Sequence, residues 1–315
     1  MAVDTRAEAP SPAGLRARLM PADVTRWTRV IAWVNLALQT IIVGTGGAVR
    51  LTGSGLGCPT WPRCTDESYV VTPAMGIHGL IEFGNRLLTF VLVIGALLLF
   101  LAVLRTVGSG RGLVLPALLI GFGIPAQAVV GGITVLTQLN PYVVGLHFVV
   151  SIGLVALSTL LVWRVHHPVA ERADLVPAGT RIVAWHVAVL ALVTILIGIV
   201  TTGSGPHAGD SGAARNGLDT ELMQHVHSWP AYVMFGLTLV LLYLVRRVPE
   251  VRRYALLLFG AELVQIGVGV LQARTGLPAG LVAAHMLLAC LITAAATAVI
   301  LSTRQPVRTG AVAAG

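Results

Sequence analysis

Eight long apolar segments decide what this chain can fold into. Each is long enough to cross the hydrocarbon core of a bilayer, which takes about 20 helical residues. Lipid cannot hydrogen-bond to an exposed backbone, and the segments are too uniformly apolar for the alternating pattern of barrel strands. We therefore expect an all-α integral membrane protein, in keeping with a composition that is 56% hydrophobic and only 11% charged. The eight expected transmembrane helices cover residues 28–48, 75–104, 113–135, 142–163, 182–202, 222–245, 254–273 and 279–302.

Arginine carries every basic side-chain charge, because the chain contains no lysine. With the N-terminus in the cytoplasm, sixteen arginines fall on the cytoplasmic side of the predicted helices. Only four fall on the opposite side, namely Arg50, Arg63, Arg215 and Arg274. This is the positive-inside distribution, so we expect a multi-pass protein of the plasma membrane with both termini cytoplasmic. The net charge of +8 then reflects orientation in the lipid bilayer and does not indicate binding to nucleic acid.

The two halves of the sequence resemble each other. The motif TGSG follows both the first and the fifth apolar segment, and the similar motifs QAVVGG and QIGVGV each begin twenty residues before a histidine, His147 or His285. Because each half has four helices and begins in the cytoplasm, the repeats are parallel, and we expect two four-helix bundles. The expected organisation is a cytoplasmic tail at 1–27, a first half at 28–163, a cytoplasmic linker at 164–181, a second half at 182–302 and a cytoplasmic tail at 303–315.

Three intramembrane histidines share one depth. His147, His227 and His285 each lie about 10 Å below the outer surface at the rise of an α-helix. Imidazoles from facing bundle helices are common axial ligands of haem iron. His227 and His285 both belong to the second half, so their spacing predicts one haem site there. The alternative is that each histidine hydrogen-bonds to a neighbouring helix.

The second apolar segment carries several polar side chains on one helical stripe, namely His78, Glu82, Asn85 and Arg86. Asn85 stands where the second half has His227, so the halves are chemically unequal. Glu82 has two compatible interpretations. It forms an ion pair with Arg86 four residues later, or it takes up protons or orients water beside a bound substrate.

The loop after the first helix reads LTGSGLGCPTWPRC and contains Cys58 and Cys64, two of the three cysteines in the chain. An outward-facing loop meets an oxidising environment, which favours a disulfide. The rival interpretation is a thiol pair that exchanges electrons or binds a metal, although two cysteines without nearby histidines make a poor zinc site. Cys290, within the last helix, is expected to be an inert small hydrophobe.

Several motifs together resemble the haem A synthase family, whose eight-helix membrane enzymes oxidise a methyl group of haem O to a formyl group. They cover nearly the whole chain outside its termini. The motifs are VRLTGSGLGCPTWPRC at 49–64, IEFGNRLL at 81–88, GGITVLTQLNP at 131–141 followed by His147, the region of His227, and GLPAGLVAAH at 276–285.

The resemblance implies a haem b cofactor in the second half, held by His227 and His285, and a substrate haem site in the first half at His147. It matches the cysteines of the outer loop to the family's cysteine pair, and Glu82 to a helix-two glutamate implicated in the reaction. Arg50, at the outer end of the first helix, either pairs with a haem propionate or extends to the membrane interface.

One departure from the family pattern concerns Asn85. The family commonly reads Glu-x-x-His-Arg in the second helix, so this chain resembles an actinobacterial-like variant with Asn85 in place of the histidine. Three arrangements of the substrate site remain open. His147 alone holds the iron, His78 substitutes from a shifted position, or the second face of the iron stays open for chemistry.

The resemblance further implies two successive oxidations, first to a hydroxymethyl group and then to a hydrated aldehyde that loses water. The implied partners are haem O, an unidentified electron donor or acceptor, and haem O synthase. A different class also uses intramembrane histidines, namely a non-enzymatic dihaem b-type electron carrier or a haem-handling transporter. Glu82 and the unequal halves favour the enzyme, because a pure electron relay would keep two matched bis-histidine sites.

Overall fold

The computed structural model describes residues 20–21, 23–106, 111–167 and 172–306. Most of the expected N-terminal and C-terminal tails, residues 1–19 and 307–315, lies outside the described residues. In the described part, eight helices are long and apolar enough to cross a membrane, which confirms the predicted fold class. They are α2 (Arg26–Leu51), α3 (Gly76–Arg105, preceded by a 3-10 turn at Pro73–Met75), α4 (Val114–Leu136), α5 (Pro141–His166), α6 (Ala178–Ser204), α7 (Thr220–Leu244), α8 (Pro249–Arg274) and α9 (Ala279–Ser302).

Several helices begin at sequence signals that fix their first turn. Thr25 accepts a hydrogen bond from the backbone N–H of Thr28 and caps α2. Asn140 caps α5 directly before Pro141, and Asp219 caps α7. Such side chains satisfy N–H groups that have no partner within the helix, and proline suits the first helical position because it lacks that N–H. The capping residues therefore set where the apolar segments enter the membrane.

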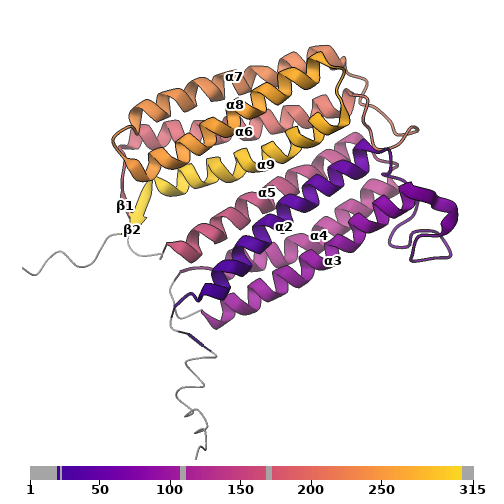
Figure 1. Cartoon of the computed structure of the whole chain (residues 1–315), viewed down its shortest axis with the longest axis horizontal. Coiled ribbons are helices and arrows are strands. Elements are labelled where there is room, and N and C mark those ends of the chain that lie inside the picture. Colours follow the sequence, from indigo (N-terminus) through magenta and orange to yellow (C-terminus); the bar gives the residue numbers. More distant parts are fainter. Residues whose placement is uncertain (1–19, 22, 107–110, 168–171, 307–315) are drawn as a thin grey trace, which may run out of the picture.

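The helices form two four-helix bundles that lie side by side (Figure 1), one made of α2–α5 and the other of α6–α9. Each bundle has its own apolar core. Leu99, Ile120 and Val165 are fully enclosed in the first, and Leu241 and Leu258 in the second. The bundles meet along α2 and α5 of the first half and α6 and α9 of the second.

Small residues allow the two bundles to approach closely. A Cβ atom on Gly44 of α2 would lie 2.9 Å from Leu287 Cδ2 of α9, and one on Gly145 of α5 would lie 2.5 Å from Ile199 Cγ2 of α6. Cys290 is buried in an apolar cluster of this interface, as expected for a small hydrophobe. Small residues are typical where membrane helices pack closely, because lipid gives no hydrophobic drive for helix association.

The internal repeat is visible in the backbone. Leu139, between α4 and α5, and Leu277, between α8 and α9, both have φ of 59°. The N–H of Leu139 donates to the carbonyl of Thr134 at 2.7 Å, and that of Leu277 donates to the carbonyl of Gln272 at 2.8 Å. Leu277 follows Leu139 by the same number of residues as His285 follows His147, and so does Gln272 follow Thr134. The two halves therefore form the same left-handed connection.

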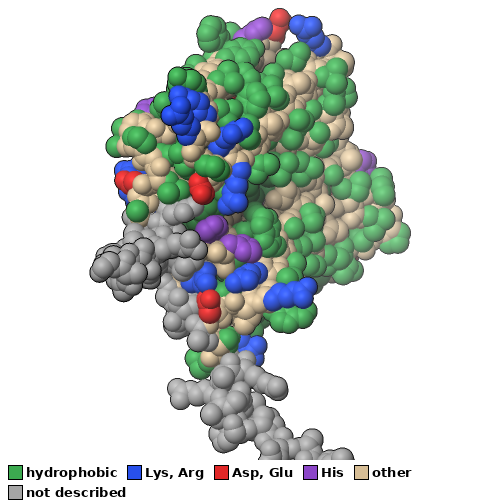
Figure 2. All heavy atoms as spheres, turned by 60° about the vertical axis from the view of Figure 1, so that its left-hand side comes forward, with side chains coloured by type: hydrophobic (Ala, Val, Ile, Leu, Met, Phe, Trp, Pro, Cys, Tyr) green, Lys and Arg blue, Asp and Glu red, His purple; other side chains and the backbone are tan. Residues whose placement is uncertain are grey.

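A short antiparallel pairing of β1 (Arg172–Asp174) with β2 (Arg304–Pro306) joins the linker between the bundles to the segment after α9. The sequence analysis did not predict these strands. Asp174 reinforces the pairing, because its carboxylate pairs with Arg304 at 2.9 Å and also with Arg181. Figure 2 shows arginine side chains gathered at this end of the molecule, while hydrophobic side chains cover much of the remaining face.

Candidate functional site

The second bundle brings His227 of α7 and His285 of α9 together. Their ring centroids lie 6.1 Å apart with the ring planes at 67°. The Nδ1 atoms of both rings are buried and have no hydrogen-bond partner among the described residues. A metal held end-on between two imidazoles, with each metal–nitrogen bond about 2 Å long, leaves the ring centres roughly 6 Å apart. The pair therefore has the separation that one iron between two histidines requires.

Each of these rings packs against bare backbone on a neighbouring helix. A Cβ atom on Gly198 of α6 would lie 2.7 Å from Cε1 of His227. A Cβ atom on Gly269 of α8 would lie 3.3 Å from Cε1 of His285. The glycines leave space for the nitrogen-bearing tips of the imidazoles, which any side chain at these positions would displace.

A glutamine fixes the helix that carries each repeated histidine. Gln265 donates from Nε2 to the backbone carbonyl of His285 at 3.2 Å, and Gln127 does the same for His147 at 2.9 Å. The ring of His147 also packs against a glycine, because a Cβ atom on Gly131 would lie 3.3 Å from its Cε1. The same three-residue arrangement thus occurs in both halves.

The first bundle differs at the sequence position that corresponds to His227. Asn85 of α3 accepts a hydrogen bond at its Oδ1 from Thr45 Oγ1 of α2 at 2.8 Å. Within the described part of the chain, no second imidazole forms a ring pair with His147. The Nδ1 atom of His147 is also buried without a partner there. The first half therefore presents one histidine where the second presents two.

His78 lies in the first turn of α3 and is exposed. Its Nδ1 is 2.9 Å from Ser54 Oγ, so the ring is tied to the outer loop. It precedes Asn85 by two helical turns, or about 10 Å along the axis. This contact favours a role in anchoring the loop, and the alternative role of His78 as an iron ligand stays a prediction.

Glu82 is buried, and both of its carboxylate oxygens accept hydrogen bonds. Its Oε1 accepts from Arg86 Nη2 at 2.5 Å and from Nε at 3.1 Å, so the predicted ion pair is present. Its Oε2 accepts from the backbone N–H of Cys58 at 2.6 Å. Arg86 also donates to the carbonyls of Cys58 and Thr60, at 3.0 and 3.1 Å. The carboxylate and the guanidinium thus both bind the backbone of the outer loop through hydrogen bonds.

The outer loop is closed by the predicted disulfide between Cys58 and Cys64, both of which are completely buried. Next to it, Trp61 packs onto α4 so closely that a Cβ atom on Gly132 would clash with its indole ring. Gly132 follows the glycine against which His147 packs. The loop therefore covers the outer end of the first bundle directly above the His147 region.

Arg50 connects the outer ends of the two bundles. Its Nε donates to the carbonyl of His207 at 2.5 Å, and its Nη2 donates to the carbonyl of Thr202 at 3.0 Å. Close by, the N–H of Gly55 donates to the carbonyl of Gly209 at 2.8 Å. The chain around the first TGSG motif is thereby joined to the chain around the second. A pairing of Arg50 with a haem propionate stays a prediction.

Known proteins resemble this chain over most of its length. Residues 29–297 match the sequence profile of the family described as COX15-CtaA, cytochrome oxidase assembly protein. The chain belongs to this family. It is 26% identical over 223 residues to the haem A synthase of Staphylococcus epidermidis, covering 68% of this chain and 70% of that relative. It is 33% identical over 185 residues to that of Lysinibacillus sphaericus, covering 57% and 56%, and 25% identical over 280 residues to that of Listeria monocytogenes, covering 84% and 91%.

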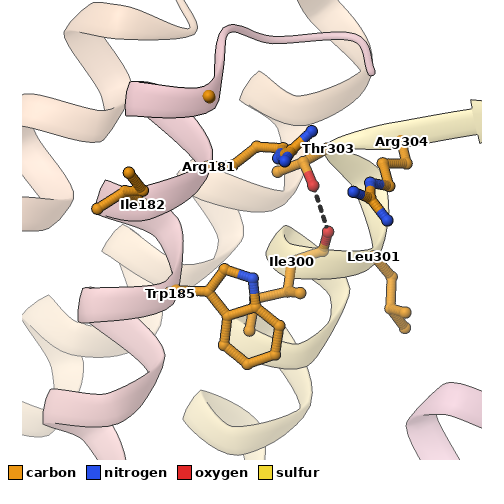
Figure 3. Close-up of a pocket in the computed structure, with 8 residues that line it drawn as sticks. Arg181, Ile182, Trp185, Ile300, Leu301, Thr303 and Arg304 are labelled. Atoms are coloured by element: carbon orange, nitrogen blue, oxygen red, sulfur yellow. Dashed lines mark hydrogen bonds between the residues drawn. The ribbon is translucent and has the colours of Figure 1, made fainter. Parts of the chain in front are cut away.

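A cavity of about 340 Å³ in this COX15-CtaA family member lies apart from the histidines (Figure 3). It is formed by the first turns of α6 and the last turns of α9, the ends opposite Gly198 and His285. Its lining is mainly apolar, with Ile182, Trp185 and Ile300 in addition to the basic side chains of Arg181 and Arg304 (Figure 3). The cavity therefore belongs to neither histidine site.

Sequence reasoning overlooked several contacts of the site. The repeated motifs beginning at Gln127 and Gln265 were recognised, but the hydrogen bond from each glutamine to a histidine carbonyl was not deduced from them. Gly198, against which the His227 ring packs, has no counterpart signal in the sequence. The position of Trp61 against α4 depends on the folded loop. The spacing of twenty residues between each glutamine and its histidine was the one available signal.

Proposed function

We propose that this chain is a haem A synthase, a membrane oxidoreductase that converts a methyl group of haem O to the formyl group of haem A for terminal oxidase assembly. The observation that carries the proposal is the inequality of the two halves in a member of this family. One half has a histidine pair at 6.1 Å, and the other has His147, with Asn85 at the sequence position of the second histidine and a buried Glu82 on the same helix as Asn85. A carrier with two equal bis-histidine sites does not fit this asymmetry.

The second half is the proposed site of haem b, with His227 and His285 as its axial ligands. The paired rings, their unpartnered Nδ1 atoms and the glycine against which each ring packs support this assignment. When bound, haem b supplies one-electron transfer, because two histidines leave no open position on its iron. Gln265 orients the helix segment that carries one ligand.

The first half is the proposed site of the substrate haem O, with His147 as the ligand to its iron. Oxidation of a methyl group to a formyl group with one water releases four protons and four electrons, through the hydroxymethyl stage and the hydrated aldehyde. The site therefore needs a group that accepts protons. Glu82 is the buried carboxylate of this half and is the proposed catalytic group.

The contacts of Arg86 suit this role for Glu82. Two backbone carbonyls of the outer loop bind the guanidinium independently of the carboxylate. Arg86 can therefore keep its place when Glu82 becomes protonated, and the loop closed by Cys58 and Cys64 need not rearrange during turnover. The disulfide and Trp61 would exclude bulk water from the reacting group.

The proposed location is the plasma membrane with both termini in the cytoplasm. The arginines gathered at the end that carries β1 and β2 support this orientation, since positive charge accumulates on the cytoplasmic side. The histidine pair and the disulfide loop then lie toward the outer face. The proposed partners are haem O, an electron donor or acceptor of unidentified nature, and haem O synthase as the source of the substrate.

Complementation tests the proposed activity. The full-length chain is expressed in a bacterium that makes haem O but whose own haem A synthase gene has been deleted. We expect the haem A absorption band to return to the membranes. A chain that reaches the membrane at normal level without restoring that band would overturn the proposal and favour the carrier class.

A further inference from the structure

A second buried carboxyl group lies in the half that carries the histidine pair. Glu262 stands midway along α8 and is 1% exposed. Its Oε1 accepts from Thr238 Oγ1 of α7 at 2.8 Å. Its Oε2 is buried and has no hydrogen-bond partner among the described residues. The proposed reaction in the first half makes no use of this group.

No cation among the described residues pairs with Glu262. The helices packed most closely against α8 are α7 and α9, and neither contains an arginine. The other charged groups of α8 itself lie at its ends, namely Glu250, Arg252, Arg253 and Arg274. The titratable side chains of α7 and α9 are Glu221, His225, His227, Tyr232, Tyr243, His285 and Cys290. A carboxylate in such apolar surroundings is costly unless a proton or a nearby positive centre compensates it.

A polar stripe leads from Glu262 to the outer end of α8. Gln265, Gly269 and Gln272 follow at three, seven and ten residues, which places them on one face of the helix. The Oε1 atoms of both glutamines are buried without a partner among the described residues. Buried oxygens of this kind are commonly satisfied by internal water. The ring of His285 packs against Gly269, at the middle of the stripe.

The first half repeats this stripe without its acid. Corresponding residues of the two halves are as far apart in the sequence as His147 and His285. Gln265 and Gly269 therefore correspond to Gln127 and Gly131, and Glu262 corresponds to Ile124. Ile124 is buried in the apolar core of the first bundle. The carboxyl group is thus peculiar to the half that contains two facing histidines.

We propose that Glu262 is a redox-linked proton site of the haem b that His227 and His285 hold. Glu262 takes up one proton from the outer aqueous phase, along the stripe of Gln265 and Gln272, when one electron enters the iron. It releases that proton when the electron leaves, so the total charge of the buried site stays constant. The electrons are those removed from the substrate methyl group under the proposed function, on which this inference rests.

The distance permits such coupling. Glu262 lies seven residues from Gly269 and therefore about 10 Å along α8 from the point where the His285 ring packs. In an apolar interior, unit charges interact strongly over this range, because little solvent screens them. A carboxylate at Glu262 would be compensated by the positive charge of an oxidised haem held by His227 and His285, and would gain a proton when reduction removed that charge.

The test is a redox titration of haem b in the purified full-length holoprotein at a series of pH values, with dithionite as reductant and the haem absorption band as the readout. We expect the midpoint potential of the unchanged protein to fall with rising pH, approaching about 59 mV per unit, the one-electron value of a tenfold change in proton activity. Glu262→Gln should make the potential independent of pH. Glu250→Gln, which changes an exposed glutamate of the same helix, should keep the slope.

A slope that persists in Glu262→Gln, or a flat profile in the unchanged protein, would overturn the inference. If Glu262→Gln fails to fold, the infrared difference between the reduced and oxidised unchanged protein decides. A carboxylic acid C=O band should appear on reduction and should shift in Thr238→Val, which removes the hydroxyl contact. Absence of that band would also overturn the inference. A protein with no bis-histidine haem spectrum would refute the cofactor assignment itself, which is a separate outcome.

Discussion

His227 and His285 face each other edge to face across the second bundle, with ring centroids 6.1 Å apart. They come from two different helices, α7 and α9, and each ring packs against a glycine of a third or fourth helix, α6 or α8. All four helices of the second half therefore contribute to this one arrangement. The first half has the corresponding His147, but Asn85 stands at the sequence position of the second histidine and bonds to Thr45.

Removal of either ring should abolish the haem b signal. His227→Ala and His285→Ala each leave one axial ligand, so we expect the low-spin bis-histidine spectrum to disappear from both purified variants. His225→Ala is the matched control, because His225 is exposed on the same helix only two residues away. Retention of the low-spin spectrum in both ligand variants would refute the assignment.

Gly198 should be the most sensitive glycine of the haem b site. In Gly198→Ala the new methyl group would lie 2.7 Å from the His227 ring, so the imidazole must move away from its ligating position. Overpacking of this kind costs about 1–3 kcal/mol, which corresponds to a retention of haem b that is roughly 5-fold to 160-fold weaker. Gly236→Ala is the control, since a Cβ atom there meets nothing within 4 Å. Haem content per protein measures both, and equal content in the two variants would contradict the packing argument.

Glu82→Gln should separate catalysis from folding. Glutamine keeps the shape of the side chain and accepts hydrogen bonds, but it cannot exchange protons. We expect the variant to fold and to keep haem b while its production of haem A falls by at least about 100-fold. The exposed Glu67, in the same outer loop, provides the control Glu67→Gln. Normal production of haem A by a folded Glu82→Gln protein would refute the catalytic role, whereas loss of folding would favour the ion pair with Arg86 as its main function.

The disulfide should stabilise the outer loop and should be present in the isolated protein. Mass spectrometry without reduction is expected to show a peptide cross-linked between Cys58 and Cys64, with Cys290 as a free thiol. Replacing both loop cysteines by serine should lower the free energy of unfolding by roughly 2 kcal/mol, the chain-entropy value for so small a ring. Two freely alkylated loop thiols under oxidising conditions would count against the assignment.

The eight helices could be predicted from the sequence because length and hydropathy decide them. The helix bounds were less accurate, since capping side chains and polar turns extend beyond the apolar runs. The helix predicted at 182–202 covers Ala178–Ser204 in the structure. The strands β1 and β2 were not predicted, because three-residue pairings between distant segments leave no periodic signal.

The histidine pair could be predicted because depth in the membrane follows directly from position along a helix. The contacts of the outer loop could not be predicted, because they join residues that only the folded loop brings together. The hydrogen bond from Cys58 to Glu82 and the contacts of Arg50 with the second half are of this kind. The disulfide was predictable because its two cysteines are close in the sequence.

The most direct test of the account is pigment analysis of the purified protein after expression in cells that supply haem O. Haems extracted from the protein are separated by chromatography and identified by mass. The account predicts haem b together with haem A, or with a hydroxylated precursor of haem A. Haem b accompanied only by unaltered haem O would contradict it.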